Sequence, residues 1–207
     1  AYLDSGRRNV WVASVELFQA SNLTNNSNPN LLYYSPLWLR DGKLVVFVST
    51  EKSAERSSGA VSRVWLMESD KLREIFSTTE SLRLLGWSGD ELLLETAEGV
   101  MKATPSDVKL VRVSLTGEHQ IVTTFKGIYA RSMTLSRDGK AIAFAARQND
   151  MNDIWTATVG RGEAKRVTNN RESRLSFSSL TFSPDGRTIF FDKQDQVSTI
   201  SMFENFE

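Results

Sequence analysis

The chain contains a single histidine, His119, and this residue decides whether a serine-type catalytic site can be assembled. Nucleophilic catalysis by a Ser-His-Asp constellation needs an imidazole beside the serine to accept its proton. His119 follows Thr116, Gly117 and Glu118, a sequence typical of a turn that leads into an outer strand. The sequence also lacks the Gly-x-Ser-x-Gly segment of a nucleophile elbow. We therefore expect His119 to be a solvated turn residue and expect no catalytic residue.

Metal and cofactor chemistry is also poorly supported by the residue types. Cysteine is absent, which removes thiolate metal sites and leaves one histidine as a nitrogen ligand. The nearest arrangement of oxygen ligands is the NDMND segment at 149–153, but it has no glycine bend and no later glutamate for calcium. A loop of Asx turns explains this segment better. We expect no metal and no other cofactor.

The charge is balanced, with 25 Lys and Arg against 25 Asp and Glu, so nucleic acid and anionic lipid are not broadly attracted. Arg171 and Arg174 interleave with Phe177 as a single-strand-binding surface would, but Glu172 interrupts them. The GRG segment at 160–162 sits at a predicted hairpin turn with no helix after it, which excludes a dinucleotide loop. No apolar run approaches the roughly 20 residues of a membrane span. We expect no nucleic-acid partner and no direct membrane insertion.

An internal repeat positions all of these residues. Segments beginning at Ser35, Thr134 and Thr181 each read as a strand, an Asp-Gly turn and a second strand. Asp-Gly supplies the positive φ angles of a tight hairpin, and the apolar runs beside it have the composition of buried strands. A degenerate copy begins at Leu84, with its turn at residues 88–90. The turns recur at roughly 48 residues, a spacing typical of four-stranded propeller blades.

A third strand follows each hairpin and carries an apolar anchor in the same phase. The anchors are Trp11, Trp65, Val111, Trp155 and Ile200. A short polar turn and a fourth strand come next. Because the tryptophans recur with the period of the repeat, we expect them to be core anchors rather than a sugar-binding platform.

These strands predict an all-β fold, a β-propeller or partial propeller of about four to five four-stranded antiparallel blade units. The predicted units are 1–25 (partial), 26–79, 80–126, 127–172 and 173–207 (partial). The end blades must be covered in one of three ways: ring closure within the chain, a homodimer through exposed blade edges, or further blades of a larger protein. The terminal units together hold more than four strands. We therefore favour a fragment of a larger propeller.

Three phrases carry a family resemblance: SPDGR at 183–187, NDIW at 152–155 and RVTNN at 166–170. They resemble the WD-like repeats of TolB-type propellers, in which a Trp-Ser-Pro-Asp-Gly hairpin is followed by Asp-Ile-Trp and Leu-Thr-Asn. Arg40 and Arg137 depart from this pattern, because they replace the proline before the turn. The closing residues 200–206 also resemble the end of propellers attached to bacterial kinases and winged-helix regulators. The resemblance implies the C-terminal part of a larger bacterial propeller protein.

Such a resemblance implies a recognition or scaffold module, often periplasmic or otherwise extracytoplasmic, whose loop faces bind a protein or peptide. The connection at 50–62 is long, polar and glycine-bearing, and we expect it to be a contact element. Tyr and Arg are enriched in interface hot spots. The predicted binding residues on that face are Tyr33, Tyr34, Arg56, Arg131, Arg147 and Asp150. The alternative that these residues merely finish strands stays open.

The sequence thus favours a non-enzymatic protein-interaction, scaffold or sensor module. An alternative is the substrate-gating propeller of a prolyl-oligopeptidase-like serine peptidase, whose catalytic α/β-hydrolase domain would lie outside this chain. A propeller lyase or lactonase is a weaker possibility, because the chain has one histidine and no evident metal-ligand cluster.

Overall fold

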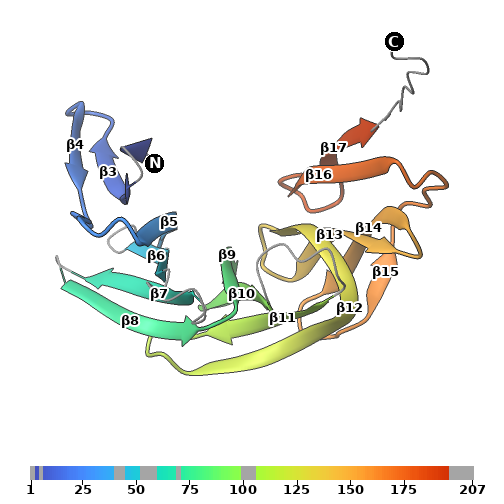
Figure 1. Cartoon of the computed structure of the whole chain (residues 1–207), viewed down its shortest axis with the longest axis horizontal. Helices are drawn as coiled ribbons and strands as arrows, with labels where there is room; N and C mark the ends of the chain where they lie inside the picture. Colours follow the sequence, from blue (N-terminus) through green and yellow to red (C-terminus); the bar gives the residue numbers. More distant parts are fainter. Residues whose placement is uncertain are drawn as a thin grey trace, which may run out of the picture.

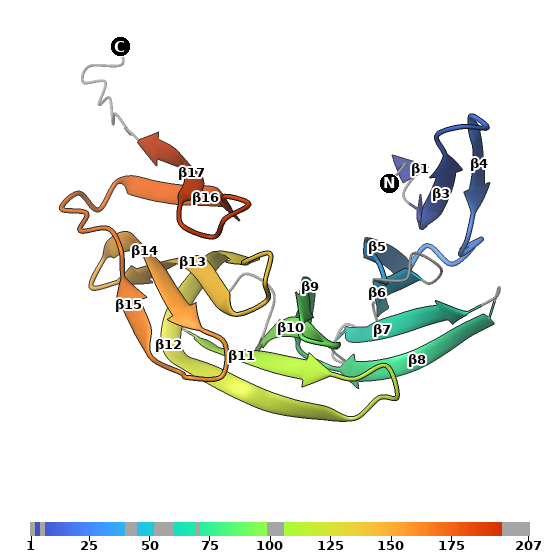
Figure 2. The same cartoon turned by 180° about the vertical axis from the view of Figure 1, so that it is seen from behind.

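The computed structural model describes residues 3–4, 7–39, 45–51, 60–68, 71–98 and 106–195. All regular secondary structure in these ranges is β-strand. None of the described residues form a helix that could cross a membrane. Figures 1 and 2 show small twisted sheets that follow one another along an open arc, with the first strands at one end and the last strands at the other. The predicted all-β propeller fold is confirmed.

Three antiparallel four-stranded blades form the centre of the arc. Blade A consists of β5 (Leu31–Trp38), β6 (Val45–Glu51), β7 (Val61–Glu68) and β8 (Lys71–Thr78). Blade B consists of β9 (Ser81–Ser88), β10 (Glu91–Ala97), β11 (Ser106–Val113) and the first part of β12 (His119–Leu135). Blade C consists of the second part of β12, β13 (Ala141–Gln148), β14 (Met151–Thr158) and β15 (Ala164–Arg166). The predicted unit boundaries stay a prediction, and the blades are defined by these strands.

Strand β12 joins two blades without a turn. Its residues up to Ile128 pair with β11, and its residues from Tyr129 pair with β13. It is therefore the outer strand of blade B and the inner strand of blade C. This continuity fixes the two sheets relative to each other through covalent backbone as well as packing.

Three antiparallel strand pairs lie at the ends of the arc. At one end are β1 (Leu3–Asp4), β2 (Arg7–Arg8), β3 (Trp11–Ser14) and β4 (Gln19–Asn22), and at the other are β16 (Leu175–Phe182) and β17 (Ile189–Asp195). β1 pairs with β2, β3 pairs with β4 and β16 pairs with β17, whereas β2 meets β5 through one parallel bridge between Arg8 and Leu32. The predicted turn at residue 41 and the anchor at Ile200 lie outside the described residues.

The Ser-x-Asp-Gly turns form as the sequence predicts. In blade C, Asp138 Oδ1 accepts hydrogen bonds from Ser136 Oγ (2.7 Å) and Lys140 N (3.1 Å), and Gly139 has a φ of +73°. The last hairpin repeats this geometry, with Asp185 Oδ1 accepting from Ser183 Oγ and Arg187 N. A side-chain acceptor and a left-handed glycine together close each hairpin.

A β-bulge interrupts the inner strand of every blade and of the last hairpin. The register shifts fall between Tyr34 and Leu37, at Gly86, between Ala130 and Ser132, and between Ser178 and Thr181. Bulges bend a strand and increase its twist. They fall within a few residues of one another in the repeat, so each inner strand is bent near the same place.

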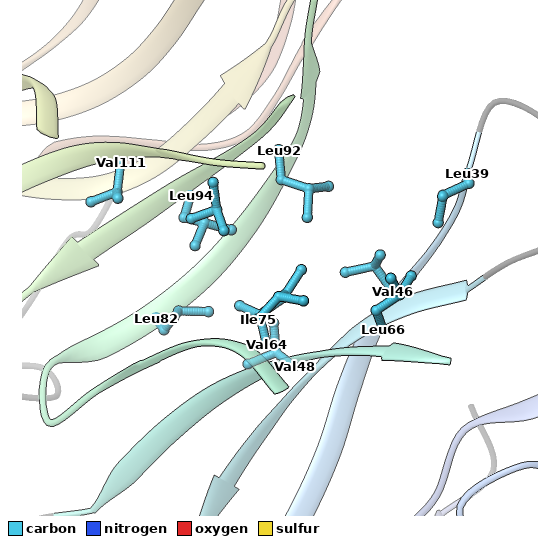
Figure 3. Packing of buried hydrophobic residues seen from close by; sticks show 11 residues of the cluster. Leu39, Val46, Val48, Val64, Leu66, Ile75, Leu82, Leu92, Leu94 and Val111 are labelled. Atoms are coloured by element: carbon cyan, nitrogen blue, oxygen red, sulfur yellow. The ribbon is translucent and has the colours of Figure 1, made fainter. Parts of the chain in front are cut away.

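The core lies between neighbouring blades. Figure 3 shows aliphatic side chains of blade A facing those of blade B. The buried members of this cluster are Leu39, Val46, Val48, Val64, Leu66, Ile75, Leu82, Leu92, Leu94, Val111 and Val113. A second cluster, around Phe125 and Phe144, fills the space between blades B and C. The anchors Trp65 and Trp155 pack against such clusters, as predicted, whereas Trp11 is 43% exposed.

Candidate functional site

The two predicted tyrosines lie on β5 but have different surroundings. Tyr33 is buried, and its ring packs edge-on against Phe47 at 5.4 Å between centroids. Burial, reinforced by the nearby charge of Glu51, raises the pKa of its phenol. The hydroxyls of Tyr34 and Thr50 are hydrogen-bonded at 2.6 Å. In this conformation Tyr33 contributes to packing, and Tyr34 ties β5 to β6.

Of the other predicted binding residues, Arg147 and Asp150 lie apart from the tyrosines. Arg147 Nη2 pairs with Asp150 Oδ1 at 3.2 Å across the β13–β14 turn in blade C, and blade B separates this pair from β5. Arg131 lies in β12, but its side chain is outside the described part of the structure, and so is the whole of Arg56. Binding by this set of residues therefore remains a prediction.

The single histidine packs against the neighbouring blade. The His119 ring meets Phe76 of blade A edge-on at 5.1 Å, and its Nδ1 lies 3.3 Å from the carbonyl oxygen of Gly117. The ring thus contacts a turn carbonyl and an aromatic side chain at the rim of the sheet. His119 is exposed, as predicted, but it is the first residue of β12 and not part of the turn before it.

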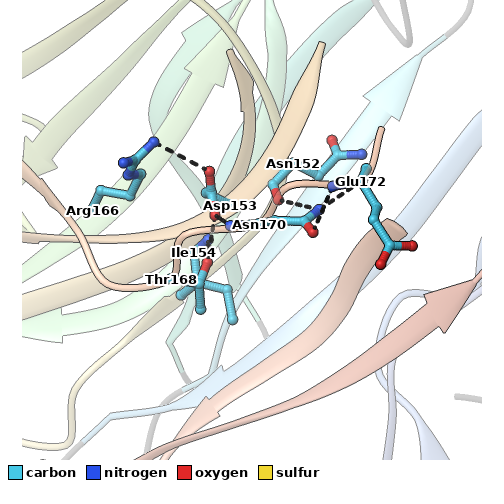
Figure 4. Close-up of polar contacts among 7 residues, drawn as sticks. All are labelled: Asn152, Asp153, Ile154, Arg166, Thr168, Asn170 and Glu172. Carbon is cyan, nitrogen blue, oxygen red and sulfur yellow. Dashed lines mark hydrogen bonds and ion pairs between the residues drawn. The ribbon is translucent and has the colours of Figure 1, made fainter. Parts of the chain in front are cut away.

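A buried carboxylate, Asp153 of β14, binds the segment that follows β15 in blade C. Asp153 Oδ1 accepts hydrogen bonds from Thr168 Oγ1 and Asn170 N, both at 2.8 Å, and the Thr168 hydroxyl oxygen in turn accepts from Ile154 N (Figure 4). The other oxygen, Oδ2, lies 3.7 Å from Arg166 Nη1. Both oxygens of Asp153 face donors of this chain. Residues 149–150 form the β13–β14 turn, but 151–153 lie in β14, so the expected loop at 149–153 is wrong for these three residues. In the described ranges no three His, Asp or Glu residues are grouped so that they could hold a metal ion.

The first hairpin contains a second copy of this network. Asn9 Oδ1 accepts from Thr24 Oγ1 at 2.8 Å and from Asn26 N at 2.6 Å, and Val10 N donates to Thr24 Oγ1 at 3.1 Å. Asn9 and Asp153 each stand two residues before a tryptophan anchor. The likeness between NLTN at 22–25 and RVTNN at 166–170 is visible in the sequence, but the partner Asn9 was not predicted.

Basic residues occupy the equivalent position in blades A and B. Two residues before Trp65 stands Arg63, whose guanidinium pairs with Glu51 (3.0 Å) and Glu74 (3.4 Å). Two residues before Val111 stands Lys109, which pairs with Glu80. Ion pairs thus replace the Asx–Thr network in the middle of the array.

The Lys109–Glu80 contact changes the pKa of both groups. Burial acts to raise the pKa of Glu80, but hydrogen bonds from Lys109 and Thr96 together outweigh it and lower the pKa. The hydrogen bond to Glu80 raises the pKa of Lys109. Each partner therefore favours the charged form of the other, as expected of an ion pair. The pair links β11 of blade B to the connection between β8 and β9.

The half-buried indoles of Trp65 and Trp155 differ in whether a hydroxyl lies beside the ring N–H. Trp65 Nε1 donates to Ser49 Oγ at 2.8 Å in blade A. In blade C the residue equivalent to Ser49 is Ala146, and the buried Trp155 Nε1 has no hydrogen-bond partner. The sequence carried this signal, because Ser49 and Ala146 occupy one position of the repeat.

Comparison with known proteins concerns the fold. No family model and no curated protein matches the sequence. TolB from Acinetobacter baumannii superposes with a TM-score of 0.59 at 21% identity, over 92% of this chain and 44% of that chain. An oligogalacturonate lyase in complex with manganese gives 0.65 at 12% identity, over 89% and 53%. The chain folds as a TolB-like β-propeller.

Peptidases are also among the similar structures. A puromycin-hydrolyzing peptidase of Mycobacterium tuberculosis superposes with a TM-score of 0.59 at 14% identity, over 81% of this chain and 29% of that chain. The TolB-like blades described above thus span 29% to 53% of the length of these proteins. At such low sequence identities, the similarity shows a shared fold and nothing further.

Proposed function

We propose that this chain is a non-enzymatic protein-interaction or scaffold module that binds a protein or peptide. One observation carries the proposal: the described side chains best suited to chemistry are engaged in blade architecture. Asp153 closes blade C, Asp138 and Asp185 close hairpin turns, and His119 packs on Phe76. The hairpins and the connections between the TolB-like blades are then the parts available to bind a partner.

The hydrogen bonds at Asp138 and Asp185 support this reading through their electrostatics. In each turn the serine hydroxyl, followed by a backbone N–H, holds the pKa of the carboxyl below its usual range. A general acid near neutral pH needs a raised carboxyl pKa. These turn carboxylates are adapted to stay ionised, as structural acceptors do.

We further propose that the module belongs to a larger bacterial protein and works outside the cytoplasm. The proposal is supported by the TolB-like fold, together with the resemblance of the SPDGR and NDIW phrases to TolB-type repeats. Fusion of the full-length protein to a reporter that is active only after export tests the location. Activity of a cytoplasm-dependent reporter instead would contradict it.

The binding function is tested with the purified chain. The immobilised chain should retain a protein or peptide that binds again, in purified form, with a defined stoichiometry. The same preparation should leave chromogenic ester and peptide substrates unhydrolysed. Hydrolysis at a rate that persists through further purification, with no binding partner recovered, would overturn the proposal.

A second candidate is a substrate-gating propeller of a serine peptidase. It is favoured by the peptidases among the similar structures, including a prolyl endopeptidase with a TM-score of 0.54 over 83% of this chain. The reading frame around this segment discriminates between the two. A neighbouring hydrolase domain would favour gating, whereas a kinase, a winged helix or an export signal would favour the interaction module.

A further inference from the structure

The β3–β4 hairpin exposes four large apolar side chains, and these fall into two pairs. Trp11 and Val15 are 43% and 85% exposed. Their counterparts in blade C are Trp155 and Val159, which pack against the cluster between blades B and C. The exposure of Trp11 and Val15 is therefore explained by the lack of a blade on that side among the described residues.

Leu17 and Phe18 at the tip of the hairpin need a different explanation. They are 68% and 93% exposed. Their counterparts at the tip of the β14–β15 hairpin are Arg161 and Gly162, which are exposed even though blade C has neighbours on both sides. A preceding blade would therefore leave Leu17 and Phe18 in water. Their exposure is a property of the tip itself.

The tip is also strained. Phe18 has a φ of +51°, in the left-handed region, where the equivalent Gly162 has +67°. A bulky aromatic residue is rarely found there, because its Cβ crowds the backbone and glycine avoids that cost. The hydrogen bond from Leu17 N to Ser14 Oγ (3.1 Å) holds the turn in this shape. Local strain beside exposed apolar area is typical of a residue retained for binding.

The charge of the hairpin indicates the chemistry of its partner. Glu16 is exposed and is the single charged residue between positions 11 and 22. An acidic residue between Leu17 and Val15 disfavours insertion at an anionic membrane surface, where basic residues are the rule. It favours a protein pocket that has an apolar floor and a basic rim.

We infer that Leu17 and Phe18, with Glu16 beside them, form a docking element for a protein partner whose apolar pocket is bordered by lysine or arginine. The inference rests on the proposed interaction function and names the hairpin tip as the contact surface. Interface anchors are commonly aromatic and surrounded by weaker polar contacts.

The test compares variants against the protein that the immobilised wild-type chain retains, once that protein has been purified. Phe18→Gly should weaken its affinity at least tenfold, as loss of an anchor residue does. Glu16→Lys should weaken binding severalfold at low salt and less at high salt. Arg161→Ala, at the equivalent tip of blade C, should leave the affinity unchanged. Phe18→Gly should also leave the urea midpoint unchanged or raise it, because it removes strain.

Four results would overturn the inference. Equal affinity of Phe18→Gly and wild type would place the interface elsewhere and leave the proposed function standing, whereas failure of the wild type to bind any protein would remove both. Phe18-dependent binding to phosphatidylserine vesicles would assign the tip to lipid. A lower urea midpoint for Phe18→Gly would assign Phe18 a structural role.

Discussion

Two variants that move one hydroxyl test the hydrogen bonding of the tryptophan anchors. Ser49→Ala removes the acceptor of the Trp65 indole N–H, which is bonded at 2.8 Å to a fully buried serine. Leaving a buried donor unpaired costs about 1–3 kcal/mol. Ala146→Ser supplies an acceptor to Trp155 Nε1, which already carries that cost. We expect Ala146→Ser to raise the free energy of unfolding by about 1 kcal/mol, the usual net value of one such hydrogen bond.

Urea unfolding of the wild type and both variants checks the two signs. With a urea dependence of roughly 2–3 kcal/mol per molar, Ser49→Ala should lower the midpoint by about 0.3–1.5 M. Ala146→Ser should raise it by less. The indole N–H resonance of Trp155 should move downfield in Ala146→Ser, as expected of a donor that gains an acceptor. A neutral Ser49→Ala together with a destabilising Ala146→Ser would refute the reasoning.

Two further changes test the side-chain networks. Asp153→Asn should lower the free energy of unfolding by less than about 1 kcal/mol, because Asn9 makes the same hydrogen bonds in the first hairpin. Asp153→Ala should lower it by about 2–3 kcal/mol. Thermal unfolding measures both losses, and equal losses would contradict the network. Ser136→Ala should raise the pKa of Asp138 toward its ordinary value of 3.8 and leave that of Asp185 unchanged in an NMR titration. Because the folded pKa of Asp138 is lowered, its stabilisation is present above the ordinary pKa and is lost as pH falls through the folded value, so the variant's deficit should shrink in acid.

The blade hairpins could be predicted because their signal is local. Asp138 and Gly139 stand in a Ser-x-Asp-Gly turn, where the side-chain acceptor and the left-handed glycine act within a few residues. The spacing of such turns then fixes the period of the repeat. The fold followed from these two features and the aromatic anchors.

The inner-strand bulges and the burial of Tyr33 could not be predicted in this way. A bulge at residues 34–37 depends on how β5 curves against β6, which no local pattern reports. Tyr33 reads as a strand-end tyrosine in the sequence, but its side of the pleat faces Phe47. For the same reason the sequence did not show that Arg63 and Lys109 replace Asp153 in blades A and B. Their glutamate partners lie on other strands or, for Glu80, in the connection between β8 and β9.

The central claim is that neighbouring blades stack side by side, so that the hairpin turn of blade C packs against the end of β9 in blade B. Two glycines, Gly139 and Gly186, test this claim most directly. Gly139 and Gly186 have φ values of +73° and +71°, so alanine is equally strained at both. A Cβ on Gly139 would lie 2.4 Å from the Trp87 carbonyl oxygen of the neighbouring blade, whereas one on Gly186 would meet nothing within 4 Å. The overlap would also disturb the buried hydrogen bond from Ser88 Oγ to Gly139 O (2.8 Å).

The decisive measurement is the urea unfolding free energy of Gly139→Ala and Gly186→Ala. Gly186→Ala should lose about 1 kcal/mol from backbone strain alone. Gly139→Ala should lose about 3 kcal/mol or more, because the contact between blades must open as well. Equal losses would show that the turn of blade C does not rest on blade B and would contradict the stacked array.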